Sequence, residues 1–378
     1  DLNSKFNIPS ASKNMANLFY GCNNFNQAVD IPSGSEDLSN MFLNCFNFNN
    51  TLQIPSTAKN LYQMFKEANN FNQEVTIPSG VTNVYSLFYN CRNFNRSISL
   101  PQGVIDVSNL FFGCENFDQT FTIPSSATNL VNLFRNCHNF NKAVTIPQGA
   151  VDVRGMFSRC NLFNQLVTIP SGVTNCENMF SECYNFNKEV TIPASVTNLS
   201  DMFNNCYNLN QSISLPYSAT NAQGMFAGCY NLRNNVYLVV GLLDTSNMFA
   251  FCNNYNHDCT IPYTVTNTYN MFSNCHIFNK NVSIPQTVTN VAWMFANCNI
   301  FNSDSIYIPT SATNAQGFLS HCYNYTHYIS IPEGVLDTSS MLSYANNWNN
   351  PIYIPNSVLN TSNMFSNCTN LNSIISGY

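Results

Sequence analysis

An Ile-Pro pair that returns every 23 residues constrains this chain more than any other feature. The isoleucine lies at Ile8, Ile31, Ile54, Ile77, Ile123, Ile146, Ile169, Ile192, Ile261, Ile284, Ile308, Ile331 and Ile354. Leu100 and Leu215 hold the same place before a proline, and Leu238 holds it with Val239 after it. One spacing is 24, between Ile284 and Ile308. A fixed period of this length is typical of a solenoid, in which each repeat packs mainly on its neighbours.

The sequence therefore predicts a single solenoid over residues 1–378, built from about sixteen coils. Hydrophobic residues make up 44% of the chain, which is enough for a continuous core, while charged residues make up only 8%. No amphipathic capping segment is recognisable at either end, so we expect an array without terminal caps. Uncapped ends would invite pairing with another chain, so we expect either a part of a larger protein that supplies the caps or chains that stack end to end.

Each coil is numbered here from its Ile as position 1. Positions 22 and 1 are apolar with one residue between them, as in Val190 and Ile192, which predicts a short strand. Position 7 is Asn or Asp in every coil, and apolar residues follow at positions 8, 11, 12 and 15. This spacing is one face of a helix with a favoured N-cap, so we expect two helical turns over positions 8 to 15. The Asn that is frequent at position 17 suits a left-handed exit from that helix. The expected fold class is an α/β solenoid of short strands and short capped helical turns.

Cysteine occupies position 15 in most coils. It does so at Cys22, Cys45, Cys91, Cys114, Cys137, Cys160, Cys183, Cys206, Cys229, Cys252, Cys275, Cys298, Cys322 and Cys368. Ala68 and Ala345 take this place in two coils, which indicates a small apolar slot. Stacked cysteines would have parallel Cβ vectors that suit a disulfide torsion poorly, and the spacing lacks the close pairs of zinc sites. We therefore expect a ladder of buried free thiols and no metal site.

The repeat resembles that of the BspA-like leucine-rich-repeat surface proteins. The family has 23-residue repeats with an L/I-P pair, a Phe three residues before a Cys and an apolar residue three after it, as at Phe203, Cys206 and Leu209. Met271, Phe272 and Cys275 belong to a run similar to the variant repeat of bacterial surface lipoproteins. One departure is the step from position 18 to position 22, which is four residues here and three in the commoner form. The resemblance implies a leucine-rich-repeat solenoid that is extracellular or at the cell surface and is used for adhesion.

Residues that could carry chemistry are few. None of the five histidines lies in a repeating place, and no G-x-S-x-G, H-E-x-x-H or P-loop string is present. His321 and His327 flank Cys322, but solvated or half-buried histidines are the simpler interpretation. We expect no enzyme, no catalytic residue and no cofactor. A net charge of −6 without a basic run argues against nucleic acid, and no apolar run reaches the roughly 18–20 residues of a membrane span.

Position 23 lies between the two inward strand residues, so its side chain is expected to point outward. It is mostly Ser or Thr, which is consistent with a ladder that merely keeps the sheet soluble, but tyrosines enter in the C-terminal half. Because Tyr is favoured in interfaces, the alternative is a contact patch with neighbouring polar residues such as Asn235 and Asp258. The candidate ligand-binding residues are Tyr237, Tyr307, Tyr328, Tyr353 and His327.

Two coils are irregular. The 24-residue coil holds an extra residue, best placed as a bulge near Ser303 and Asp304, and the coil from Leu238 to Leu243 lacks the proline and is unusually apolar. Each could mark a bend or a contact, or drift in a redundant array.

These features favour a non-enzymatic extracellular adhesin or receptor-binding module that uses its exposed strand face. Its partner would be a surface protein or glycan of a host or neighbouring cell. The alternative is a structural protein that associates end to end into an extracellular filament or surface layer.

Overall fold

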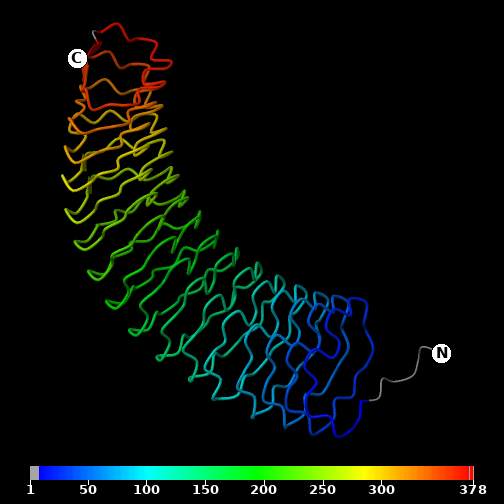
Figure 1. Cartoon of the computed structure of the whole chain (residues 1–378). Coiled ribbons are helices and arrows are strands. Elements are labelled where there is room, and N and C mark those ends of the chain that lie inside the picture. Colours follow the sequence, from blue (N-terminus) through cyan, green and yellow to red (C-terminus); the bar gives the residue numbers. More distant parts are fainter. Residues whose placement is uncertain (1–7, 374, 378) are drawn as a thin grey trace. The chain divides into compact units, whose positions relative to one another are not determined.

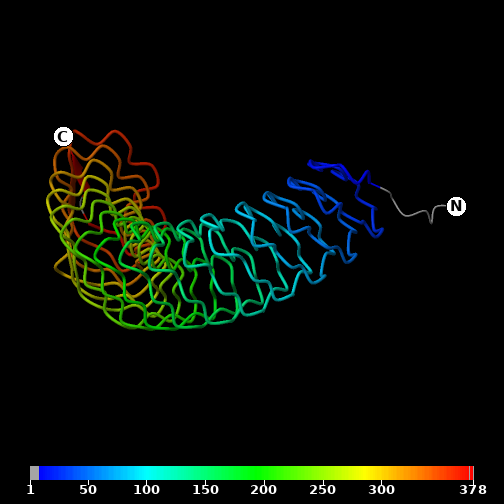
Figure 2. The same ribbon diagram turned by 90° about the horizontal axis from the view of Figure 1, so that it is seen from below.

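The structure is a computed structural model that describes residues 8–373 and 375–377. The chain forms two compact units, one up to Pro193 and one from Ala194. Within each unit the chain winds in successive single-turn coils that lie side by side, one for each sequence repeat (Figures 1 and 2). The predicted repeat solenoid is therefore confirmed within each unit.

Regular strands are sparse among the described residues, and all four lie in the second unit. They are β1 (Cys259–Thr260), β2 (Val282–Ser283), β3 (Ile352–Ile354) and β4 (Ile375–Gly377). β1 pairs with β2, and β3 with β4, in parallel. The prediction of a strand in every coil is therefore wrong. The predicted alternation of side chains is confirmed, since Val75 and Ile77 are buried and Thr76 between them is exposed.

The predicted helix over positions 8 to 15 is also wrong, because this segment is a run of turns in every coil and no helix occurs in the described ranges. In the coil from Ile31, the Met41 N–H donates to the Leu38 carbonyl at 3.2 Å and the Cys45 N–H to Phe42 at 3.0 Å. These bonds span three residues, as in β-turns, instead of the four of an α-helix.

Two left-handed residues in each coil prevent the helix. Positions 10 and 14 have positive φ in every coil, as at Asn40 (55°) and Asn44 (61°), whereas position 17 does not. A residue with positive φ at the third place of a turn is the signature of a type II turn, which favours Gly and Asn. Position 7 does accept the N–H two residues on, as Asp37 does from Ser39 at 3.0 Å, so the expected cap closes a turn instead of a helix.

The alternate N–H groups of this segment bond to the next coil. Leu38, Asn40, Phe42 and Asn44 donate to the carbonyls of Asn60, Tyr62, Met64 and Lys66 at 2.8–3.0 Å. Parallel bridges at position 7 continue the same ladder through most coils. We call positions 7 to 15 the bonded side of a coil.

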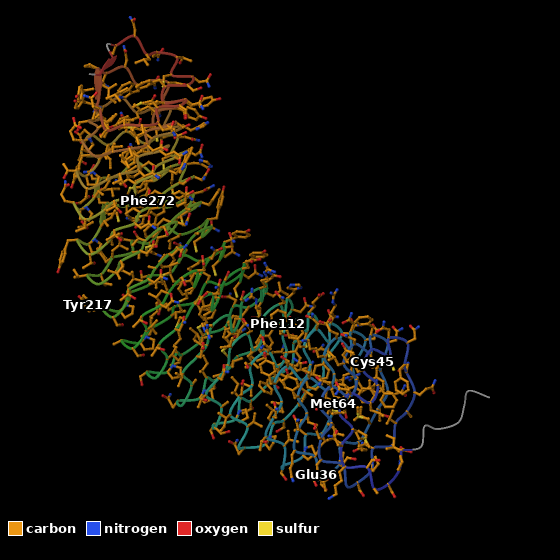
Figure 3. All side chains as sticks on the ribbon, viewed as in Figure 1. Glu36, Cys45, Met64, Phe112, Tyr217 and Phe272 are labelled. Atoms are coloured by element: carbon orange, nitrogen blue, oxygen red, sulfur yellow. The ribbon has the colours of Figure 1, made fainter. Side chains whose placement is uncertain are left out.

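The core holds two columns of phenylalanine rings, one at position 12 and one at position 18. The ring centroids of Phe88 and Phe94 lie 4.2 Å apart in one coil, and both rings are buried. Figure 3 shows Phe272 of the second unit among the interior side chains. From Phe42 to Phe180, successive centroids at position 12 are 5.6–6.0 Å apart. From Phe48 to Phe186, those at position 18 are 5.8–6.2 Å apart.

Backbone pairing is sparse at the remaining strand positions. Paired strands lie about 4.8 Å apart, but the ring spacing does not decide where they form, since the Tyr255 and Phe278 centroids are 6.5 Å apart in the two coils whose strands β1 and β2 pair. Between Ile54 and Ile169, no backbone hydrogen bond joins positions 21, 22, 23 or 1 of neighbouring coils. We call positions 21 to 23 and 1 to 4 the open side.

The thiols at position 15 are buried as predicted, apart from exposed Cys22 and half-buried Cys368. Most of the buried thiols at position 15 donate the S–H to the position 12 carbonyl of the preceding coil, as Cys45 does to Phe19 at 3.0 Å. Burial raises the pKa of Cys275 to about 12, although a backbone hydrogen bond from Cys252 opposes the shift. Cysteine thus suits this slot because it is small, apolar and able to donate one weak hydrogen bond.

Candidate binding groove

The open side of the second unit carries a groove of about 580 Å³ between the coil of Leu238 and the coil of Ile261. Its walls include Tyr237, Val240, Pro262 and Tyr263, and its polar lining comes from Asn235, Asp258 and Thr260. It opens where the strand pairing ends. β1 bonds to β2 on one side, but no backbone hydrogen bond joins β1 to residues 236–238 on the other.

The tyrosines at the groove are unusually exposed. Tyr237 is 77% exposed and Tyr263 is 66% exposed, and Tyr217 in the preceding coil is 85% exposed. Figure 3 shows Tyr217 pointing away from the coils. Together with the adjacent Val240, at 49%, these side chains form an exposed patch over three successive coils, which we call the tyrosine patch.

The tyrosine patch stands out from the rest of the array at position 3. Tyr217, Val240 and Tyr263 occupy this position in three consecutive coils, and every other coil has Ser, Gln, Ala, Thr, Glu or Asn there. The loss of proline at Val239, noted in the sequence, falls in the middle coil of the three. Sequence reasoning found Tyr237 but missed Tyr217 and Tyr263. Tabulating position 3 across the coils would have found them.

Grooves between coils recur on the open side of the first unit but lack tyrosines, and the one aromatic residue that lines them is the buried Phe121. One of about 460 Å³ is lined by Ser79, Ser99 and Pro101, and another of about 320 Å³ by Thr122, Ser125 and Thr145. An open seam between coils is therefore a general consequence of the fold, whereas the tyrosines are specific to the second unit.

The polar residues of the tyrosine-lined groove are held by neighbouring coils. Asp258 accepts the Asn281 N–H through Oδ1 at 3.0 Å. Asn235 accepts the Tyr255 hydroxyl through Oδ1 at 3.4 Å. Tyr255 takes the place of the usual phenylalanine at position 18, and its ring is fully buried. The hydroxyl of the buried Tyr255 thus holds the Asn235 side-chain amide in place at the groove.

The other predicted binding residues do not reach this groove. Tyr307 is 38% exposed and its hydroxyl donates to the Ile284 carbonyl, so it folds back on the preceding coil. Tyr328 is 57% exposed, and His327 is half-buried with its carbonyl bonded to Trp348 Nε1 at 3.1 Å. Tyr353 lies in β3 and is half-buried. None of these residues lines the groove, so the structure separates Tyr237 from the rest of the predicted set.

The 24-residue coil places its extra residue in a turn at Asp304 and Ser305, close to the predicted bulge. Ser303 is buried there, and its hydroxyl donates to Asn281 Oδ1 at 2.9 Å. The described residues contain no group of three His, Cys, Asp or Glu that could hold a metal ion. They also contain no helix long and apolar enough to cross a membrane.

The chain is similar to solved structures of bacterial leucine-rich repeat proteins. The structure from Bacteroides ovatus shares 18% identity and a TM-score of 0.62, over 91% of this chain and 88% of that one. A leucine-rich repeat protein from Eubacterium ventriosum shares 18% identity and a TM-score of 0.49, over 71% and 81% of the chains. A leucine rich cell surface protein from Faecalibacterium prausnitzii shares 18% identity and a TM-score of 0.43, over 85% and 83%. The similarity to the Bacteroides protein confirms the leucine-rich-repeat fold that the 23-residue motif implies.

No curated protein has a significantly similar sequence. One family model does match repeatedly, and its matches together cover nearly all of the chain. They span residues 13–124, 101–192, 128–238, 151–263, 220–331 and 332–378. The chain, a leucine-rich-repeat solenoid, therefore belongs to the family described as "Mycoplasma protein of unknown function, DUF285".

Proposed function

We propose that this chain is an extracellular, non-enzymatic binding protein that attaches to a surface molecule of another cell through the open side of its second unit. The observation that carries the proposal is the tyrosine patch beside the 580 Å³ groove. Exposed aromatic residues gathered in one place are typical of binding surfaces, because they supply contact area at a low entropic cost.

The lining of the groove favours binding over catalysis. Asp258 is its one carboxylate, and no His, Cys, Lys or Arg lines the groove with it. General acid–base catalysis needs proton donors and acceptors positioned on the reacting atoms, and nucleophilic catalysis needs a base beside the nucleophile. A groove of tyrosine, proline and aliphatic side chains with three polar groups is the usual composition of a binding site.

The repeat architecture supports the same function. The bonded side carries the backbone hydrogen bonds that join the coils, so the exposed residues of the open side, at positions 23 and 3, can vary without loss of the fold. The location at a cell surface is part of the proposal and rests on the resemblance of the repeat to surface proteins. End-to-end self-association stays a prediction, which sedimentation over a dilution series would test.

Binding of the fluorescently labelled chain to suspended epithelial cells, measured by flow cytometry, tests the proposed function. We expect saturable binding that falls at least tenfold in the triple variant Tyr217→Ser, Tyr237→Ser, Tyr263→Ser. The matched control is the double variant Tyr230→Ser, Tyr269→Ser, which removes exposed tyrosines from positions 16 and 9 and should bind as the wild type does. Equal binding by the triple variant, or no saturable binding, would contradict the proposal.

A further inference from the structure

We propose that the groove between the coils of Leu238 and Ile261 binds an uncharged sugar, with Tyr237 and Tyr263 as stacking platforms. This inference rests on the proposed function and assigns a ligand class to it. The chemistry of the groove carries the assignment through its ring faces, its hydrogen-bonding groups and its lack of positive charge.

The ring faces are available to a ligand. Tyr237 and Tyr263 keep 77% and 66% of their surface in water, and neither has an aromatic or cationic stacking partner among the described residues. The face of an aromatic ring is negative and attracts the weakly positive C–H groups of a flat aliphatic ring. A pyranose presents such C–H groups on one face and directs its hydroxyls sideways. Two uncovered tyrosines on neighbouring coils can therefore hold the faces of a sugar.

The hydrogen-bonding groups of the groove suit those hydroxyls. Asp258 uses one oxygen for the Asn281 N–H, which leaves its second oxygen as an acceptor, and it forms no ion pair within the described chain. Asn235 uses its oxygen for Tyr255, so its amide N–H groups are the part left for a ligand. Thr260 adds a hydroxyl on the exposed side of β1.

Backbone groups of β1 add hydrogen-bonding atoms to the groove. In β1, the N–H groups of Cys259 and Ile261 donate toward the next coil, to Asn281 at 2.9 Å and Ser283 at 3.0 Å. Strand residues alternate in direction, so the N–H and C=O of Thr260 face the groove instead. No backbone partner meets them from residues 236–238. Groups of this kind are normally satisfied by water or a ligand, and sugar hydroxyls can both donate to them and accept from them.

Two other ligand classes fit less well. A proline-rich peptide stacks on tyrosines but has no N–H on its prolines, so it offers no donor to Asp258 or to the Thr260 carbonyl. An anionic glycan would meet a carboxylate, in a groove without lysine, arginine or histidine and on a chain of net charge −6. The volume of about 580 Å³ lies within the roughly 300–1,000 Å³ of small-ligand sites.

The test is binding of the full chain to immobilised glycans that include neutral hexoses, N-acetylhexosamines, sialylated glycans and sulfated glycans, with a proline decamer as the peptide probe. We expect binding to neutral hexoses or N-acetylhexosamines. The affinity should fall at least tenfold in Tyr237→Ser and in Tyr263→Ser, and should fall in Asp258→Asn. Tyr230→Ser is the control that should bind normally, and circular dichroism checks that each variant keeps the wild-type fold.

Three outcomes would overturn the assignment. These are binding to sialylated or sulfated glycans only, binding to the proline decamer without glycan binding, and neutral-sugar binding that all three groove variants retain. If cells bind the chain through its tyrosine patch while no glycan does, the sugar assignment fails and the proposed function stands. If neither cells nor glycans bind, both fail.

Discussion

The two sides of a coil differ in how they hold their neighbours. On the bonded side of the Ile31 coil, four backbone N–H groups donate to the next coil at 2.8–3.0 Å. On the open side, Leu52 to Ile54 form no backbone hydrogen bond with Val75 to Ile77, although the apolar side chains of both segments turn toward the core. The bonded side thus joins the coils through backbone hydrogen bonds, and the open side of these two coils lacks them. This leaves seams that accept new side chains, and the tyrosine patch occupies one of them.

The largest expected effect is alkaline destabilisation of the bonded side, where the thiols are. Burial raises the pKa of Cys275 to about 12 and raises the pKa of Cys298 well above the ordinary thiol value of about 9. Below pH 9 the thiols are protonated in both the folded and the unfolded state, so they add no pH dependence. Above pH 9 the unfolded chain loses its thiol protons first, and stability should fall between pH 9 and about 12, by about 1.4 kcal/mol per thiol per pH unit.

Urea midpoints at pH 8, 9 and 10 measure this effect. Cys275→Ala introduces the residue that Ala68 and Ala345 provide in two other coils. It should remove the contribution of one thiol from the fall in the free energy of unfolding with pH. A urea midpoint that is the same at pH 8, 9 and 10 would show that the thiols have similar pKa values in the folded and the unfolded chain. That result would contradict their burial in the core.

The second prediction compares one residue of the phenylalanine columns with one of the open side. Phe88→Ala should lower the free energy of unfolding by about 3–5 kcal/mol, because it leaves a cavity between stacked rings. Ser99→Ala, at exposed position 23, should change it by less than about 0.5 kcal/mol. Chemical denaturation followed by circular dichroism measures both changes. Similar losses in the two variants would mean that the open side contributes to stability as much as the core does.

The third prediction concerns the left-handed turns. Asn109 has a φ of 55°, and a β-branched residue there should destabilise the chain by about 1–2 kcal/mol. Asn109→Val should therefore lower the melting temperature, whereas Asn109→Gly should be tolerated. Both variants lose the same 3.3 Å hydrogen bond from Asn132, so the difference between them isolates the backbone conformation. Equal melting temperatures would argue against left-handed turns.

The sequence predicted which residues are buried better than it predicted their backbone. The 8, 11, 12 and 15 spacing correctly placed Leu38, Met41, Phe42 and Cys45 inside. A run of turns buries the same positions as a helix, so the pattern could not separate them. The signal that could have done so is the repeated Asn or Gly at positions 10 and 14, as at Asn17 and Gly21, because these residues favour positive φ.

Strand pairing was beyond local reasoning for a different reason. The alternation at positions 22, 23 and 1 was visible in the sequence, but pairing depends on how closely neighbouring coils approach at these positions, which no pattern within one repeat determines. The candidate site was predicted in part. Tyr237 followed from the alternation of side chains along a strand. Tyr217 and Tyr263 lie in the turn after the proline, where no regular alternation predicts whether a side chain points outward.

Amide hydrogen exchange within one coil tests the contrast between the two sides most directly. The N–H groups of Ser86, Phe88 and Asn90 donate to the next coil at 2.6–3.2 Å, whereas Ile98 and Leu100 have no backbone partner. We predict slow exchange in peptides that cover residues 86–90 and fast exchange in peptides that cover residues 98–100. We also predict slow exchange at Cys259 and Ile261, whose N–H groups donate to the coil that contains β2. Equal protection of residues 86–90 and 98–100 would show a continuous sheet on both sides and contradict the account.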